Sequence, residues 1–262
     1  MSFLEIYLLA GVSILAINTA LWLASLRVKN SSIIDPFWSI LFLIAAIVYF
    51  ALAAKGSQDR QLLLLALVTI WSLRLSIYLA WRNRGKGEDF RYRKWREDYG
   101  DRWWWRSFFQ VFLLQGLLAW IISIPLLAAM AGRSPAHLTV LDGLAGVVWL
   151  IGFFFEAVGD FQLARFKADP ANKGQVLRTG VWRYTRHPNY FGEATQWWGY
   201  YLMALAAGGF WTIYAPLLMT VLLLRVSGVT LLEKTLTKTK PQYQEYIATT
   251  SAFVPWFPKK RA

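Results

Sequence analysis

The sequence predicts an all-α integral membrane protein with about seven transmembrane helices in a single domain over residues 1–262. Apolar residues fall in runs of about 20, the length of helix that crosses a hydrocarbon core roughly 30 Å thick. Lys and Arg gather instead in the segments between these runs. Helices are expected rather than strands because open strands would leave backbone groups unpaired in lipid.

The apolar runs define the expected helices in chain order. The chain begins without a basic segment or a small-residue cleavage site, so the first run is expected to be a retained span rather than a signal peptide. The expected spans cover residues 3–26, 36–54, 61–81, 107–130, 141–163, 190–207 and 210–232.

Basic residues are distributed unequally among the connections. Nine lie between Arg82 and Arg106 and six between Arg165 and Arg186, whereas the connection after 107–130 holds only Arg133. Basic loops stay on the cytoplasmic side of a membrane. We therefore expect a multi-pass membrane protein with an external N-terminus and a cytoplasmic C-terminus.

Composition excludes several functional classes. The chain has no cysteine, so disulfides, thiolate catalysis and cysteine-bound metals are excluded. Two histidines are too few for a histidine-only metal site, and we expect no metal. The net charge of +13 lies beside the expected spans, which favours membrane lipid over nucleic acid as its partner. The sequence leaves the oligomeric state open.

Several ionisable residues occur within or beside the expected spans, where a charge costs roughly 2.5–3.5 kcal/mol. Glu156 and Asp160 are four residues apart and share one helical face. An internal salt-bridge network is one interpretation. A cavity for a polar, partly anionic ligand is favoured for the set as a whole. The other members are Asp35, Arg74, Glu193, Arg225 and Glu233.

Two basic connections, which contain residues 82–92 and 180–193, mix arginine, aromatic and amide side chains. Arginine binds phosphate bidentately, aromatic rings stack on flat rings, and acids or amides bind hydroxyl groups. This combination favours a nucleotide over lipid headgroups. No glycine-rich dinucleotide fingerprint or phosphate loop is present, so helix ends and loops would hold the nucleotide. His187, before Pro188, either caps a turn or contacts phosphate.

The run Tyr184–Glu193, YTRHPNYFGE, resembles the signature of the steroid 5α-reductase superfamily in its branch of bacterial membrane proteins. Shorter forms of this pattern occur in isoprenylcysteine and phospholipid methyltransferases. Other elements resemble the reductases specifically: Arg74 with Tyr78, the Asn-Arg-Gly-Lys run at 83–86, and Asp160 four residues after Glu156. The resemblance covers about residues 70–258 and implies an integral protein of a bacterial inner membrane.

The resemblance implies that the protein binds NADPH and reduces a carbon–carbon double bond conjugated to a ketone in a lipid-soluble, steroid-like substrate. The residues it implies for the cofactor are Arg74, Tyr78, Asn83, Arg84, Lys86, Glu156, Asp160, Arg186, His187, Asn189, Tyr190, Glu193 and Arg225.

The sequence departs from the steroid reductases at the expected proton donor. Trp71 stands where they have a tyrosine, and Asp35 is the only acid comparable to the Gln-Glu pair of their second span. A donor at the ketone oxygen lowers the barrier to hydride transfer, and a protonated buried acid can serve. Asp35 is the first catalytic candidate and Tyr78 the second. Asp35 could instead cap the helix that begins at Pro36.

Two other functions remain open. A methyltransferase that uses S-adenosylmethionine on a lipid or prenylated substrate would share the Arg-His-Pro element. A non-catalytic scaffold or transporter is disfavoured, because no pair of glycine- or proline-broken spans occupies corresponding halves of the chain.

Overall fold

The computed structural model describes residues 1–53, 56–226 and 228–259, except for the side chains of residues 231 and 235. These residues are helical throughout, apart from connections and one isolated β-bridge between Thr185 and Ser251. The expected all-α fold is therefore confirmed for the described chain.

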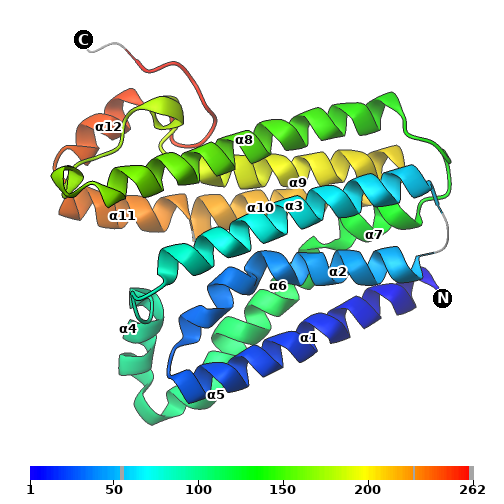
Figure 1. Ribbon diagram of the computed structural model, residues 1–262, viewed down its shortest axis with the longest axis horizontal. Coiled ribbons are helices and arrows are strands. Elements are labelled where there is room, and N and C mark those ends of the chain that lie inside the picture. Colours follow the sequence, from blue (N-terminus) through cyan, green and yellow to red (C-terminus); the bar gives the residue numbers. More distant parts are fainter. Residues whose placement is uncertain (54–55, 227, 260–262) are drawn as a thin grey trace. The chain divides into compact units, whose positions relative to one another are not determined.

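The chain forms two compact units. Unit 1 contains residues 1–139 and 203–212, and unit 2 contains residues 140–202 and 213–262. Within unit 1, α2 packs against α1, α3, α6 and α7 (Figure 1). The helices of this unit are α1 (Phe3–Val28), η1 (Ser31–Phe37), α2 (Trp38–Leu52), α3 (Gln58–Asn83), α4 (Phe90–Tyr99), η2 (Gly100–Arg102), α5 (Trp103–Ser107), η3 (Phe108–Leu113), α6 (Leu114–Ile122) and α7 (Ile124–Ala131).

Unit 2 is built on the long helix α8 and most of α9. Its C-terminal part continues through η7 into α11 and α12, which contact each other. From residue 140 onward the helices are α8 (Val140–Ala168), η4 (Pro170–Asn172), η5 (Gly180–Arg183), α9 (Pro188–Ala206), η6 (Phe210–Ile213), α10 (Tyr214–Val221), η7 (Leu222–Val226), α11 (Val229–Thr239) and α12 (Tyr243–Thr249). The end of α9 and most of η6 belong to unit 1.

Five helical stretches of the described chain are long and apolar enough to cross a membrane. They match the first five expected spans. The sixth expected span is α9, which is not among the five and carries polar residues in its first turns, and the seventh is the shorter apolar helix Phe210–Val226. The expected end of the second span at residue 54 lies outside the described residues. The five stretches are Phe3–Val28, Ser31–Leu52, Gln58–Asn83, Phe90–Ala131 and Val140–Ala168.

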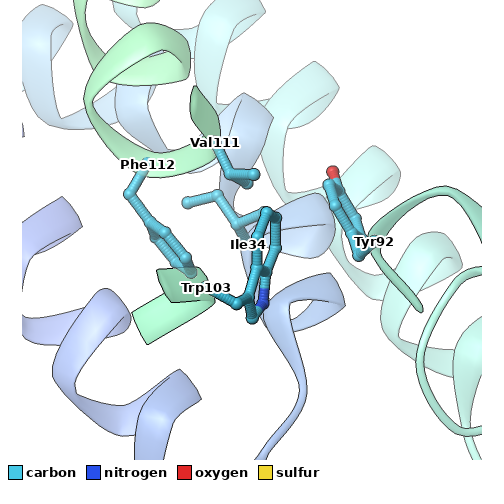
Figure 2. Close-up of a cluster of buried hydrophobic side chains, with 5 residues drawn as sticks. All are labelled: Ile34, Tyr92, Trp103, Val111 and Phe112. Atoms are coloured by element: carbon cyan, nitrogen blue, oxygen red, sulfur yellow. The ribbon is translucent and has the colours of Figure 1, made fainter. Parts of the chain in front are cut away.

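The basic connection between Arg82 and Arg106 is more helical than the sequence suggested. Helix α4 begins after Asp89, whose carboxylate accepts a hydrogen bond from the Arg91 N–H. Its aromatic side packs beside Trp103, which is 2% exposed, in a cluster with Phe112 (Figure 2). The apolar pattern of the fourth span does not reveal α4, because α4 buries aromatic rings and leaves its many charges outside.

Glycines allow α8 and α9 to pack at close range. A Cβ atom on Gly152 would lie 2.6 Å from the Gly192 carbonyl oxygen and 2.7 Å from the Gln196 nitrogen. These neighbours are backbone atoms and cannot rotate away. Any side chain at Gly152 must therefore push the two helices apart.

Replacing Gly152 with Ala should lower the thermal stability of the purified protein by the equivalent of roughly 1–3 kcal/mol, the usual cost of overpacking. Gly146→Ala is the matched control, because it lies on the same helix with nothing within 4 Å of the added Cβ. Thermal unfolding in detergent should show a clear loss for the first variant only. Equal melting temperatures would contradict the close packing of α8 and α9.

Candidate functional site

The residues implied for the cofactor divide between the two units. Unit 1 holds the group on and after α3, together with Asp35. Unit 2 holds the group on α8, on α9 and in the segment before it, and Arg225.

On α3, Tyr78 is surrounded by positive charge. The guanidinium carbon of Arg74 lies 5.6 Å from the centre of the Tyr78 ring, and that of Arg82 lies 5.7 Å from it. The three residues are spaced by four, so they share one helical face. The phenol ring therefore contacts two cations, and their combined positive charge suits an anionic ligand.

The chain turns sharply after α3 and exposes further cations. Gly85 and Gly87 have φ angles of +75° and +72°, which L side chains rarely adopt, and nothing lies within 4 Å of a Cβ built on Gly85. Arg84 and Lys86 flank Gly85, and both are exposed. Neither side chain forms an ion pair or hydrogen bond with another described residue. A Gly-rich turn with two available cations fits a phosphate group.

Asp35 forms a pair that the sequence did not indicate. The Tyr92 hydroxyl donates to Asp35 Oδ1 at 2.7 Å, and Arg91 Nη2 lies 3.9 Å from Asp35 Oδ2. Asp35 does not cap a helix: η1 is capped by Asn30, and α2 starts at Trp38 without a side-chain cap. The helix-cap interpretation of Asp35 was therefore wrong.

Glu88 fixes α4 beside the segment that contains Asp35. Its carboxylate accepts bonds from Arg96 Nε at 2.9 Å and Arg96 Nη2 at 2.8 Å, and from the Ser31 N–H at 2.7 Å. Burial raises the pKa of Glu88, but these hydrogen bonds outweigh it, so the pKa lies below its ordinary value. The Asp89 N–H donates to Ser32 Oγ in addition. The contacts of Glu88 and Asp89 thus hold α4, and with it Tyr92, beside Asp35.

In unit 2, α8 and α9 bring two acids together with two amides. Asn189 Nδ2 donates to Asp160 Oδ1 at 3.2 Å, and Gln196 Nε2 donates to Glu156 Oε2 at 2.5 Å. Both acids are buried, as is Glu193. The sequence placed Asp160 and Asn189 in one site, and the structure brings them together. Gln196, which is fully buried, was not anticipated.

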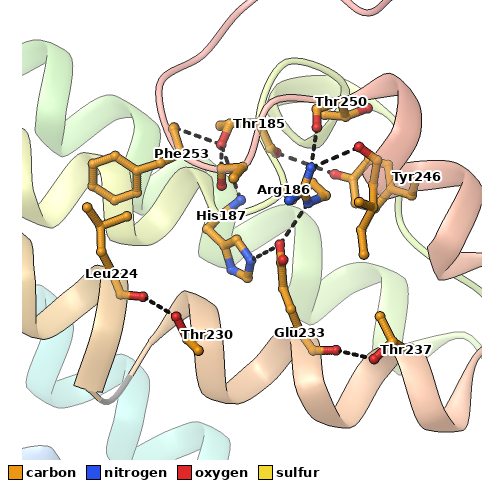
Figure 3. Close-up of polar contacts among 12 residues, drawn as sticks. Thr185, Arg186, His187, Leu224, Thr230, Glu233, Thr237, Tyr246, Thr250 and Phe253 are labelled. Carbon is orange, nitrogen blue, oxygen red and sulfur yellow. Dashed lines mark hydrogen bonds and ion pairs between the residues drawn. The ribbon is translucent and has the colours of Figure 1, made fainter.

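Arg186 and His187 converge on Glu233 of α11 (Figure 3). Arg186 Nε donates to Glu233 Oε1 at 2.7 Å, and His187 Nε2 lies 3.1 Å from the same oxygen. Burial raises the pKa of Glu233, but the bonds to His187 and Arg186 outweigh it and lower the pKa to about 2. The His187 ring also stacks on Tyr190, with ring centres 5.6 Å apart.

Arg186 also fastens the C-terminal segment. Its Nη1 donates to the carbonyl oxygens of Ile247, at 3.2 Å, and Thr250, and its backbone N–H donates to Ser251 at 2.9 Å. Figure 3 shows Thr250 beside the Arg186 guanidinium. Most of the hydrogen-bonding groups of the Arg186 guanidinium therefore hold the fold together. Nε2 of His187 contacts Glu233, and the His187 carbonyl oxygen accepts a hydrogen bond from the Phe191 N–H of α9 at 3.0 Å.

Arg225 stands apart from these contacts. It lies in η7, close to the end of the seventh expected span, and its side chain is exposed. It forms no ion pair or hydrogen bond with another described residue, so its charge is available to a ligand.

The comparisons with known proteins identify the family. The model of the family described as a protein of unknown function, DUF1295, matches residues 21–250. The chain belongs to the DUF1295 family. A relative of this DUF1295 protein is an uncharacterized protein of Schizosaccharomyces pombe, 28% identical over 228 residues. The match covers 76% of this chain and 65% of the relative, and no solved structure matches.

The sequence indicated the candidate site residues more often than the residues that form hydrogen bonds with them. It singled out Asp35 and Glu233 as unusual acids, but not Tyr92 as the partner of Asp35. Tyr92 lies in a charged connection and follows an arginine. Only the folding of that connection as α4 places its hydroxyl near residue 35, so no local pattern signals the pair.

The low pKa of Glu233 predicts acid sensitivity. Because the folded pKa of about 2 lies below the ordinary 4.5, ionised Glu233 stabilises the fold above pH 4.5. That stabilisation is lost progressively as the pH falls from 4.5 towards 2. Thermal unfolding at pH 6 and at pH 3 should show a smaller pH-dependent loss in Glu233→Gln than in wild type.

Glu97→Gln is the control for this comparison, because Glu97 is an exposed carboxylate. It should retain the pH dependence of the wild type. Parallel pH profiles for wild type and Glu233→Gln would show that Glu233 does not anchor Arg186 and His187.

Proposed function

We propose that this DUF1295 protein is a membrane reductase that uses NADPH to reduce a carbon–carbon double bond conjugated to a ketone in a lipid-soluble, steroid-like substrate. The observation that carries the proposal is the hydrogen-bonded pair of the partly buried Asp35 and the buried Tyr92. A carboxyl group hydrogen-bonded to a phenol beside an apolar cluster is suited to act on the oxygen of an apolar ketone.

Reduction needs a hydride at one end of the conjugated system and a stabilising donor at the other. NADPH supplies the hydride when it is bound. Negative charge then collects on the ketone oxygen, where a positioned donor lowers the barrier. In the proposal, protonated Asp35 is this donor, and Tyr92 orients its carboxyl group through the 2.7 Å hydrogen bond. The α-carbon then takes a proton from water, which completes the saturated ketone and leaves Asp35 protonated. Tyr78, whose ring contacts Arg74 and Arg82, is the second candidate donor.

The cofactor is proposed to be held by the residues that the reductase resemblance implies. Arg84 and Lys86, on the turn at Gly85, have the charge and the open space to bind phosphate. Asp160 with Asn189, and Glu193 nearby on α9, offer acceptors and donors for hydroxyl or carboxamide groups. The proposal keeps the expected seven spans in a bacterial inner membrane, with the C-terminus in the cytoplasm.

The first test is the identity of the cofactor. Protein purified in detergent should be retained on a 2′,5′-ADP resin and released by NADPH, because the 2′-phosphate needs the arginines and lysine described above. A methyltransferase would not be retained and would instead bind S-adenosylmethionine. Binding of S-adenosylmethionine without retention on the resin would overturn the reductase proposal.

Removing the cations after α3 should weaken NADPH binding. The double variant Arg84→Gln/Lys86→Gln is expected to raise the Kd for NADPH about tenfold or more, because each charge-assisted hydrogen bond contributes about 1.5–3 kcal/mol. Arg102→Gln, another exposed arginine of unit 1, should leave the Kd unchanged. Titration of NADPH fluorescence measures both, and equal effects of the two variants would contradict a specific phosphate contact.

Removing the proposed donor should affect chemistry rather than cofactor binding. Asp35→Asn is expected to lower turnover of an enone about a hundredfold or more, the usual range for a general acid, with the Kd for NADPH unchanged. Tyr92→Phe should cause a smaller loss. Tyr99→Phe is the control, since Tyr99 lies on the same helix and stacks on Trp103.

The assay follows oxidation of NADPH with progesterone, which carries a ketone conjugated to a double bond, and with an isoprenoid enone. Unchanged turnover in Asp35→Asn would remove Asp35 from the mechanism while leaving cofactor use intact.

A further inference from the structure

Unit 2 contains a pocket of about 400 Å³ that the proposed reductase chemistry does not use. It lies where the segment before α9 meets α12 and the C-terminal segment. None of its lining residues belongs to the set that the family resemblance implies for NADPH. Those that matter to the argument are Arg178, Thr179, Arg183, Tyr246, Thr249 and Thr250.

The two arginines of this pocket play different roles. Arg178 is held in place: its Nη1 donates to Glu245 Oε2 at 2.8 Å, and its Nη2 donates to the Gln242 carbonyl oxygen. Arg183 is exposed and forms no ion pair or hydrogen bond with another described residue. Glu245 pairs with Arg178, so the lining keeps a net positive charge with the Arg183 guanidinium available to a ligand.

The remaining polar groups complete the donor set. The Thr249 hydroxyl donates to the Glu245 carbonyl oxygen at 3.0 Å, so its proton is occupied. The Tyr246 hydroxyl is occupied too, by the carbonyl oxygens of Trp182 and Thr185. Tyr246 therefore contributes a buried ring as a wall. The Thr179 hydroxyl forms no hydrogen bond with another described residue and is exposed at the mouth, so it remains as a donor beside Arg183.

The frame of the pocket is held by backbone bonds. The Arg186 N–H donates to Ser251 at 2.9 Å, the Trp256 N–H donates to Tyr184 at 2.9 Å, and the Lys259 N–H donates to Thr249 at 2.9 Å. The C-terminal segment is thus tied back along the pocket. A site preorganised in this way loses little conformational entropy when it binds a ligand.

We propose that this pocket binds a phosphate group, carried either by an anionic phospholipid or by a small soluble phosphate ester. Guanidinium and hydroxyl donors match the oxygens of a phosphate, and arginine binds it bidentately. The pocket is larger than an isolated phosphate needs, which leaves room for a glycerol or another ester group. None of the lining residues is one of the proposed cofactor contacts, and the argument for phosphate binding does not depend on the reductase proposal.

Thermal-shift titrations of the full-length protein test the proposal and separate the two carriers. In one arm the protein is placed in phosphatidylcholine nanodiscs with increasing phosphatidic acid. In the other it is held in detergent with increasing inorganic phosphate or glycerol 3-phosphate at constant ionic strength. A saturable rise in melting temperature is expected in one arm, and the arm in which it occurs identifies the carrier.

Arg183→Gln should raise the apparent Kd about tenfold or more, the effect of losing a charge-assisted hydrogen bond. Lys173→Gln is the matched control, because it removes one exposed charge from the same connection without lining the pocket, and it should behave like wild type. Both variants should bind NADPH as wild type does.

Three results would overturn the proposal. One is the absence of saturable stabilisation in both arms. A second is an equal loss of binding in Arg183→Gln and Lys173→Gln, which would indicate only general charge attraction. The third is a matching loss of NADPH affinity in Arg183→Gln, which would make the pocket part of the cofactor site.

Discussion

Polar groups buried between apolar helices must be hydrogen-bonded by other parts of the protein, because lipid supplies no water to pair with them. This constraint organises both units of the chain. In unit 1, Asp35 accepts a hydrogen bond from Tyr92, and the ion pair between Glu88 and Arg96 keeps the two residues together. In unit 2, Glu233 binds Arg186 and so connects α11 with the segment before α9.

The same constraint separates residues that hold the fold from residues available to a ligand. Arg186 combines an ion pair with bonds to several carbonyl oxygens, so part of its role is structural. Arg84, Lys86 and Arg225 are exposed and make no such contacts with the residues that the structure describes. The proposal assigns phosphate binding to exposed cations of this kind, since their charges are not already neutralised. His187 belongs with Arg186, through its contact with Glu233.

The fold class and the first five spans were predictable because they follow from length and apolarity alone. The seven-residue helix η1 and the helix α4 were not, because they depend on caps and on aromatic packing over many residues of chain. The pairing of Asp160 with Asn189 was anticipated from the family pattern, whereas no local signal joined Asp35 to Tyr92. Their separation of 57 residues means that only the folded chain brings them together.

The central claim is that exposed cations, rather than the buried ionic pairs, bind the phosphates of NADPH. An experimental density map of the protein prepared with saturating NADPH tests it most directly. The account predicts dinucleotide density with a phosphate within hydrogen-bonding distance of the Arg84 and Lys86 side chains, and an unchanged contact between Arg186 and Glu233. Absence of dinucleotide density at saturation, or phosphates bound by Arg186 after its separation from Glu233, would contradict the account.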